Sequence, residues 1–213
     1  MTLSIRNLDA PLGTEVSGID LSKPVALGDV ETIEDVWRER LVVVFHGQKL
    51  SDPQLIAFSR NFGELDPPGP NPYGEPFNKE HPELNVISNV VENGKPIGNL
   101  GDGEAVWHAD MTYVDVPPKA AMLHSLEVPP PEAGGNTYFA NMFVAYETLP
   151  ADLKTAAAGK IAVRRPTARA CCARATRKSL TSGKRSAHII PWCAPSRRLG
   201  VRRCFSAVAR MPI

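Results

Sequence analysis

The chain has 213 residues, of which 43% are hydrophobic, enough for one domain with a sizeable core. No run approaches the roughly 18 consecutive apolar residues of a membrane span, and the start lacks the charged and apolar regions of a secretory signal. We therefore expect a cytoplasmic protein that makes no membrane contact.

The formal net charge of +1 averages two unlike segments. Residues 1–163 contain 11 Lys and Arg and all 23 Asp and Glu, a net charge of −12. Residues 164–213 contain 13 Lys and Arg and no acid, a net charge of +13, and they hold all four cysteines. This tail shows no sustained apolar period of 2 or 3.6, so we expect it to be disordered or poorly packed. The predicted domain is residues 1–163, followed by the basic, Cys-containing tail 164–213.

Patterning along the first part of the chain predicts two strands and two helices. The strands are expected within residues 12–22 and 41–45, and a helix within 29–41 has acids early and arginines late, as the helix dipole favours. A second helix is expected within 51–65, with Ser51 as N-cap and Gly63 at its C-terminal end.

The second part reads as strands separated by Pro- and Gly-rich turns. After a long loop at 66–82, we expect strands at 84–90, 120–128 and 136–141, a turn at 93–98 and one helix through 143–160. The predicted fold class is α+β, mainly β, with helices flanking a sandwich of sheets.

The stretch "WHADM" places His108 and Asp110 two residues apart. On an extended strand, residues i and i+2 point to the same face, so both side chains can reach one ion. Two histidines and one carboxylate with open positions are typical of Fe(II) oxygenases. By itself the tripeptide fits a satisfied histidine beside a surface carboxylate better than a metal site.

The surrounding motifs resemble those of the taurine/2,4-D dioxygenase family of Fe(II)- and 2-oxoglutarate-dependent oxygenases. They are Trp107-His108-Ala109-Asp110, then Gly134-Gly135-Asn136-Thr137, Phe139 and Tyr146. The resemblance also includes "GTEVSGIDLS" and "LVVVFHGQKLSDPQLIAFSRNFGEL", and it covers roughly residues 1–163.

The resemblance implies that His108 and Asp110 are iron ligands and that the Thr137 hydroxyl contacts 2-oxoglutarate. It implies a double-stranded β-helix, a cupin-like jelly roll that is incomplete in this chain. The implied reaction uses molecular oxygen to hydroxylate a small organic acid, a taurine-like sulfonate or an aryloxyalkanoate, with succinate and carbon dioxide as co-products. Homo-oligomers are common in the family.

Other polar residues are weaker candidates. We expect His124 to be packed within a strand, His46 to lie at a strand end near the surface, and His81 to lie in a loop. Three further residues are as consistent with solvated positions as with a pocket wall: Tyr73, Asn99 and Glu104.

The family pattern also requires a second histidine and an arginine for 2-oxoglutarate, well over a hundred residues after His-x-Asp. The chain ends 103 residues after Asp110, and His188 does not match that distal motif. Read from the third base of the Ala187 codon, Ala187–Val201 allows x-His-His-Pro-Leu-Val-Arg-Thr-x-Pro-Glu-Thr-Gly-Arg. This resembles the family's His-Pro-Val-Val-Arg-Thr-His-Pro-Glu-Thr-Gly-Arg, so we interpret the tail as a shifted reading frame.

Two other classes remain open. One is a non-catalytic protein that keeps the pocket without completing the iron site. The other uses the basic tail on nucleic acid phosphates, but the tail matches no nucleic-acid motif and is poor in aromatic residues. The tail's cysteines lack paired C-x₂-C spacing, so zinc is not expected either.

Sequencing the coding DNA around residue 164 tests the shifted frame. We expect an extra or missing base there, and a restored frame that encodes the distal histidine and arginine. Codons that are incompatible with the alternative frame would refute it.

Overall fold

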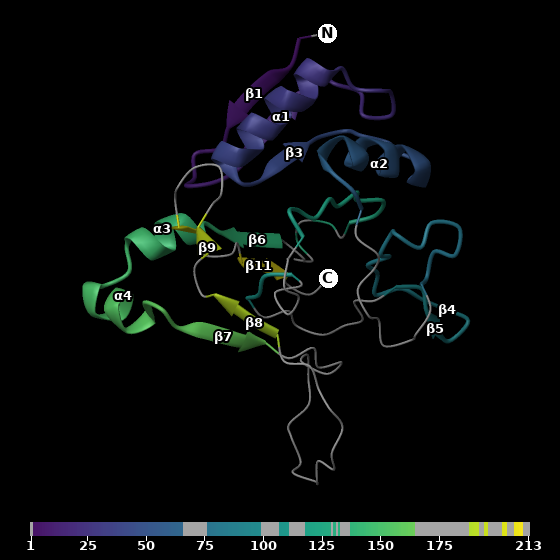
Figure 1. Ribbon diagram of the computed structural model, residues 1–213. Coiled ribbons are helices and arrows are strands. Elements are labelled where there is room, and N and C mark those ends of the chain that lie inside the picture. Colours follow the sequence, from purple (N-terminus) through teal and green to yellow (C-terminus); the bar gives the residue numbers. More distant parts are fainter. Residues whose placement is uncertain are drawn as a thin grey trace. The chain divides into compact units, whose positions relative to one another are not determined.

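The computed structural model describes residues 2–65, 76–98, 107–110, 118–128, 130, 132 and 137–164, together with four short strands in the tail. These residues divide between two units (Figure 1). The first comprises Met1–Pro68, Pro76–Val86 and Ala121–Glu127, and the second comprises Gly69–Glu75, Ile87–Ala120 and Val128–Ile213. No helix in the described part of the chain has the length and apolar character to cross a membrane.

The first unit is built on a three-stranded sheet. Its elements are β1 (Ser4–Asn7), β2 (Thr14–Ser17), α1 (Leu27–Arg40), β3 (Val43–Phe45), α2 (Asp52–Ser59) and the 3₁₀ helix η1 (Arg60–Phe62). Strand β2 lies in the centre, antiparallel to β1 and parallel to β3, with Val16 opposite both Ile5 and Phe45. Parallel neighbours need a crossover, and α1 provides it. Helix α1 therefore contacts β2 and β3 (Figure 1).

The core among the described residues lies in this unit. Its buried apolar side chains are Val16, Leu21, Val30, Ile33, Ile56 and Phe58. The Phe58 ring stacks edge-on against Phe45 and Phe62, with centroid distances of 5.7 and 5.4 Å. Thr14 is fully buried beside them, and its hydroxyl donates a hydrogen bond to the Arg6 carbonyl oxygen at 3.2 Å. The core therefore joins the central strand to both helices.

Two long polar side chains hold the connecting loops against this core. The Arg40 guanidinium at the end of α1 donates to the carbonyl oxygens of Leu8, Ala10 and Gly13, with its shortest bond of 2.9 Å to Ala10. The Gln48 amide accepts from the Leu21 N–H at 2.9 Å and donates to the Ile19 carbonyl at 3.1 Å. Each side chain thus satisfies backbone groups that no strand or helix pairs.

The helix predicted within 51–65 is confirmed as α2 continued by η1. The Ser51 backbone N–H donates to Gln54 Oε1 at 2.8 Å, which ties down the first turn. The helical segment ends before Gly63, whose φ of 148° suits glycine. The helix within 29–41 and the strands within 12–22 and 41–45 are likewise confirmed as α1, β2 and β3.

The second unit contains β4 (Val91–Glu92), β5 (Lys95–Pro96), β6 (Thr137–Ala140), α3 (Met142–Glu147), α4 (Ala151–Ala157) and β7 (Ile161–Arg164). Strands β4 and β5 form a hairpin around Asn93 and Gly94, whose positive φ values of 50° and 75° fit a two-residue turn. This confirms the predicted turn, and β6 confirms the strand at 136–141.

Three sequence predictions for the residues after 82 are wrong. Neither 84–90 nor 120–128 forms a strand. The single helix through 143–160 is two helices, because Pro150 has no N–H to donate and disfavours helical geometry at the preceding residue. The second helix starts directly after this proline.

The tail contributes strands β8 (His188–Pro191), β9 (Ala194–Pro195), β10 (Arg202–Arg203) and β11 (Ala207–Arg210). Strand β8 pairs antiparallel with β7, and β11 pairs antiparallel with β6. Strands β9 and β10 pair with each other.

The Arg40 contacts predict a specific loss of stability. Arg40→Ala should lower the free energy of unfolding by about 1–2 kcal/mol, because it removes the guanidinium hydrogen bonds to the carbonyl oxygens of Leu8, Ala10 and Gly13. The control is Arg38→Ala on the same helix, whose ion-pair partners are the side chains of Glu34 and Asp35, and it should cost below about 1 kcal/mol. Urea unfolding measures both. Equal losses would contradict the role of Arg40.

Candidate functional site

The two predicted metal ligands lie together in the second unit. His108 Nε2 is 3.0 Å from Asp110 Oδ1, although only two residues separate them in sequence. His108 forms a single β-bridge and Asp110 lies in a turn, and their contact shows that the two side chains take the same side. The His108 side chain is about one-third exposed and that of Asp110 about half, at 34% and 53%. The pair is therefore open to solvent on one side.

This arrangement offers one imidazole nitrogen and one carboxylate to a shared point. That donor set suits a divalent first-row metal such as Fe(II). A neutral imidazole and an ionised carboxylate are the forms that bind metal. Within the described ranges, no group of three His, Cys, Asp or Glu side chains is placed to hold an ion. His108 and Asp110 thus provide two of the three ligands in a site of two histidines and one carboxylate.

Thr137, the predicted 2-oxoglutarate contact, is the first residue of β6. It is exposed. In the strand register it lies opposite Arg210 of β11. The structure thus joins His108 to Asp110, and the role of Thr137 stays a prediction.

The other histidines mostly follow the sequence predictions. His46 lies just after β3 and is 70% exposed, with Nε2 3.4 Å from Glu15 Oε1, and His81 lies in a loop. The Arg6 guanidinium, with a smaller contribution from His46, lowers the pKa of the Glu15 carboxyl. Among the weaker candidates, Tyr73, Asn99 and Glu104 lie outside the described residues, and His188 is placed only by its backbone in β8.

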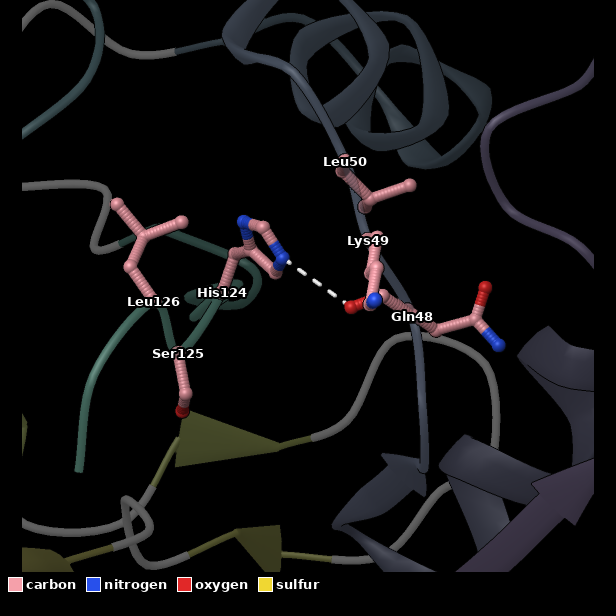
Figure 2. A pocket seen from close by; sticks show the side chains of 6 residues that line it. All are labelled: Gln48, Lys49, Leu50, His124, Ser125 and Leu126. Atoms are coloured by element: carbon pink, nitrogen blue, oxygen red, sulfur yellow. Dashed lines mark hydrogen bonds between the residues drawn. The ribbon is translucent and has the colours of Figure 1, made fainter.

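The structure also contains a hollow in the first unit that sequence patterning does not reveal. It has a volume of about 430 Å³ and is lined by Gln48, Lys49, Leu50, His124, Ser125 and Leu126 (Figure 2). His124 is half-buried, and its Nε2 lies 3.4 Å from the Gln48 carbonyl oxygen. The two lining segments are far apart in sequence, so no local motif marks the hollow.

Comparison with known proteins gives a match over most of the chain. The sequence pattern of the family described as "Taurine catabolism dioxygenase TauD, TfdA family" matches residues 4–192. The alpha-ketoglutarate-dependent 2,4-dichlorophenoxyacetate dioxygenase of Cupriavidus pinatubonensis is 36% identical over 148 residues, covering 66% of this chain and 50% of the relative. Pentalenolactone F synthase of Streptomyces avermitilis is also 36% identical, covering 67% of this chain and 46% of the relative. The chain thus spans about half the length of these relatives.

Solved structures agree with the sequence matches. A taurine dioxygenase from Burkholderia xenovorans superposes with a TM-score of 0.69 and 27% identity, covering 95% of this chain and 62% of that one. The fold observed here is therefore that of taurine dioxygenase-like proteins over the matched length.

Proposed function

Because the chain belongs to the TauD, TfdA family, we propose that it carries part of the active site of an Fe(II)- and 2-oxoglutarate-dependent dioxygenase. The observation that carries this proposal is the convergence of His108 Nε2 and Asp110 Oδ1 at 3.0 Å. Two side chains that meet on an exposed surface, inside the motif the family shares, fit a shared metal better than an isolated hydrogen bond.

In the proposed site, His108 and Asp110 hold the metal and Thr137 holds the cosubstrate. His108 binds through a neutral Nε2 and Asp110 through an ionised oxygen. The Thr137 hydroxyl donates a hydrogen bond to a carboxylate of 2-oxoglutarate. Fe(II) held there would, with 2-oxoglutarate and molecular oxygen, supply the oxidising chemistry whose products are succinate, carbon dioxide and a hydroxylated substrate. The protein's own part is to orient these groups and the substrate.

The proposed substrate is a small organic acid, a sulfonate or an aryloxyalkanoate. Support comes from the names of the relatives, which act on 2,4-dichlorophenoxyacetate and taurine. Pentalenolactone F synthase and the 2,4-dichlorophenoxyacetate dioxygenase are both 36% identical to this chain, so sequence identity does not select the substrate. Fold does not choose it either.

The proposal for the fold is that residues 1–163 are the N-terminal part of a jelly-roll domain and that 164–213 come from a shifted reading frame. The change of charge at residue 164 and the back-translation of Ala187–Val201 support it. The family match extends to residue 192 and so includes some of this tail.

Metal binding tests the proposed pair directly. Anaerobic titration calorimetry with Fe(II) should detect binding by the full chain. His108→Ala and Asp110→Ala should each weaken it at least about tenfold, since even changes behind the ligands cost about 10–100-fold. His81→Gln removes an imidazole outside the site and should leave the affinity unchanged. Equal affinity in all four proteins would refute the site.

Cosubstrate binding tests Thr137. Thr137→Val keeps the shape of the side chain but removes its hydroxyl, and it should weaken 2-oxoglutarate binding to the Fe(II)-loaded chain by about tenfold. Thr155→Val is the control, because the Thr155 hydroxyl donates to the Ala151 carbonyl oxygen within α4. Fluorescence or calorimetric titration reports the affinity. A similar loss in the control, or none in Thr137→Val, would remove Thr137 from the site.

A further inference from the structure

Strand β6, which begins with Thr137, is paired with a strand of the basic tail. Strand β11 (Ala207–Arg210) runs antiparallel to it, and Figure 1 shows the two strands side by side. The register sets Arg210 opposite Thr137 and Val208 opposite Phe139. Residues directly opposite each other in an antiparallel pair share a face, and so do residues two apart along a strand. These four residues therefore belong to one face of the ribbon.

This face combines a hydroxyl, a cationic residue and an apolar pair. Thr137 and Phe139 are both exposed, Phe139 at 38%. Neither β6 nor β11 contains an aspartate or a glutamate, and residues 164–213 contain none either. No carboxylate of the strand pair therefore competes for Arg210. A guanidinium is always charged, and its planar fork binds a carboxylate through two parallel hydrogen bonds.

The spacing between paired strands suits one small anionic group. Residues directly opposite each other in an antiparallel pair have Cα atoms roughly 4.5–5.5 Å apart. A carboxylate has two oxygens, so one can accept from a donor on each strand. A single exposed arginine holds an anion weakly in water, whereas a second donor fixed by strand pairing gives the contact a defined geometry.

We propose that Arg210 and Thr137 form a binding site for the carboxylate group of a small organic acid. Thr137 provides a neutral donor and Arg210 the charge, and the Phe139–Val208 pair at the next position of this face suits the apolar part of the acid. The ligand class rests on the proposed function, in which the carboxylate comes either from 2-oxoglutarate or from the acid that is hydroxylated.

Arg210 is distinct from the arginine that the family pattern places with a second histidine. It lies in the tail that we assign to a shifted reading frame, and only its register with β6 sets it opposite Thr137. The chain as it stands contains this residue, whichever frame the tail came from. The tail thus takes part in the site instead of merely following the domain.

Affinities for two acids test the site and identify the source of the carboxylate. The full chain, loaded anaerobically with Fe(II), is titrated calorimetrically with 2-oxoglutarate and separately with phenoxyacetate. Arg210→Gln should weaken the binding of at least one acid about tenfold, because a hydrogen bond to a charged group is lost. Thr137→Val should weaken the same acid, and that acid is the one whose carboxylate occupies the site.

Arg203→Gln is the matched control. Arg203 is also an arginine of a paired tail strand, but it lies opposite Ala194, which has no hydroxyl. The substitution removes the same charge from the tail, so it should leave both affinities unchanged. A loss that depended only on the total charge of the tail would be equal in the two glutamine variants.

Hydrogen exchange gives a second readout. An acid that bridges β6 and β11 binds only the paired strands, so a saturating concentration should stabilise the pairing and slow amide exchange in residues 137–140. The slowing should be absent or much smaller in Arg210→Gln at the same acid concentration. Mass spectrometry of the exchanged peptides measures both.

The outcomes separate this site from the proposed function as a whole. Equal affinities of the Arg210→Gln and Arg203→Gln chains, or no slowing of exchange at saturation, would overturn the site. A loss in Thr137→Val without a loss in Arg210→Gln would remove the tail from it and leave Thr137 as the proposed cosubstrate contact. An unchanged chain that binds neither acid would overturn both the site and the proposed function.

Discussion

The hydrogen-bonding demand of the strand backbone governs this structure. Strand β2 meets it fully, because β1 pairs with one edge and β3 with the other. That central position is also where burial is deepest, since Val16 and Thr14 are the most buried side chains described. Strand β1, which pairs with β2, is exposed throughout. Residues 121–127 form no strand, and Met122, Leu123 and Leu126 among them are exposed. Burial is thus deepest where a strand is paired along both edges, as β2 is.

The elements that could be predicted from sequence are those whose signals are local. Ser51 marks the start of α2, and Gly63 marks the end of η1, which continues it. Asn93-Gly94 marks the turn between β4 and β5. Strand β1 was not predicted, because its four residues are exposed and show no alternation of buried and exposed positions. The strand predicted at 120–128 has the right residues, but a strand also needs a neighbour, and a neighbour is not encoded locally.

In the candidate site, too, the features with local sequence signals could be predicted and the others could not. The convergence of His108 and Asp110 could be predicted without the fold, because the two residues are only two positions apart, although Asp110 lies in a turn and not on the expected strand. Thr137 lies in another element, and sequence spacing alone does not give its distance from the pair. The hollow beside His124 was missed for the same reason, since Gln48 and His124 are 76 residues apart. The cytoplasmic location and the homo-oligomer stay predictions.

The proposed metal ligands differ in how far apart they lie in the sequence. Two donors two residues apart need little chain ordering to meet, whereas a donor from a distant segment carries the entropy cost of closing a long loop. The fold normally bears that cost, so metal affinity and folding are coupled.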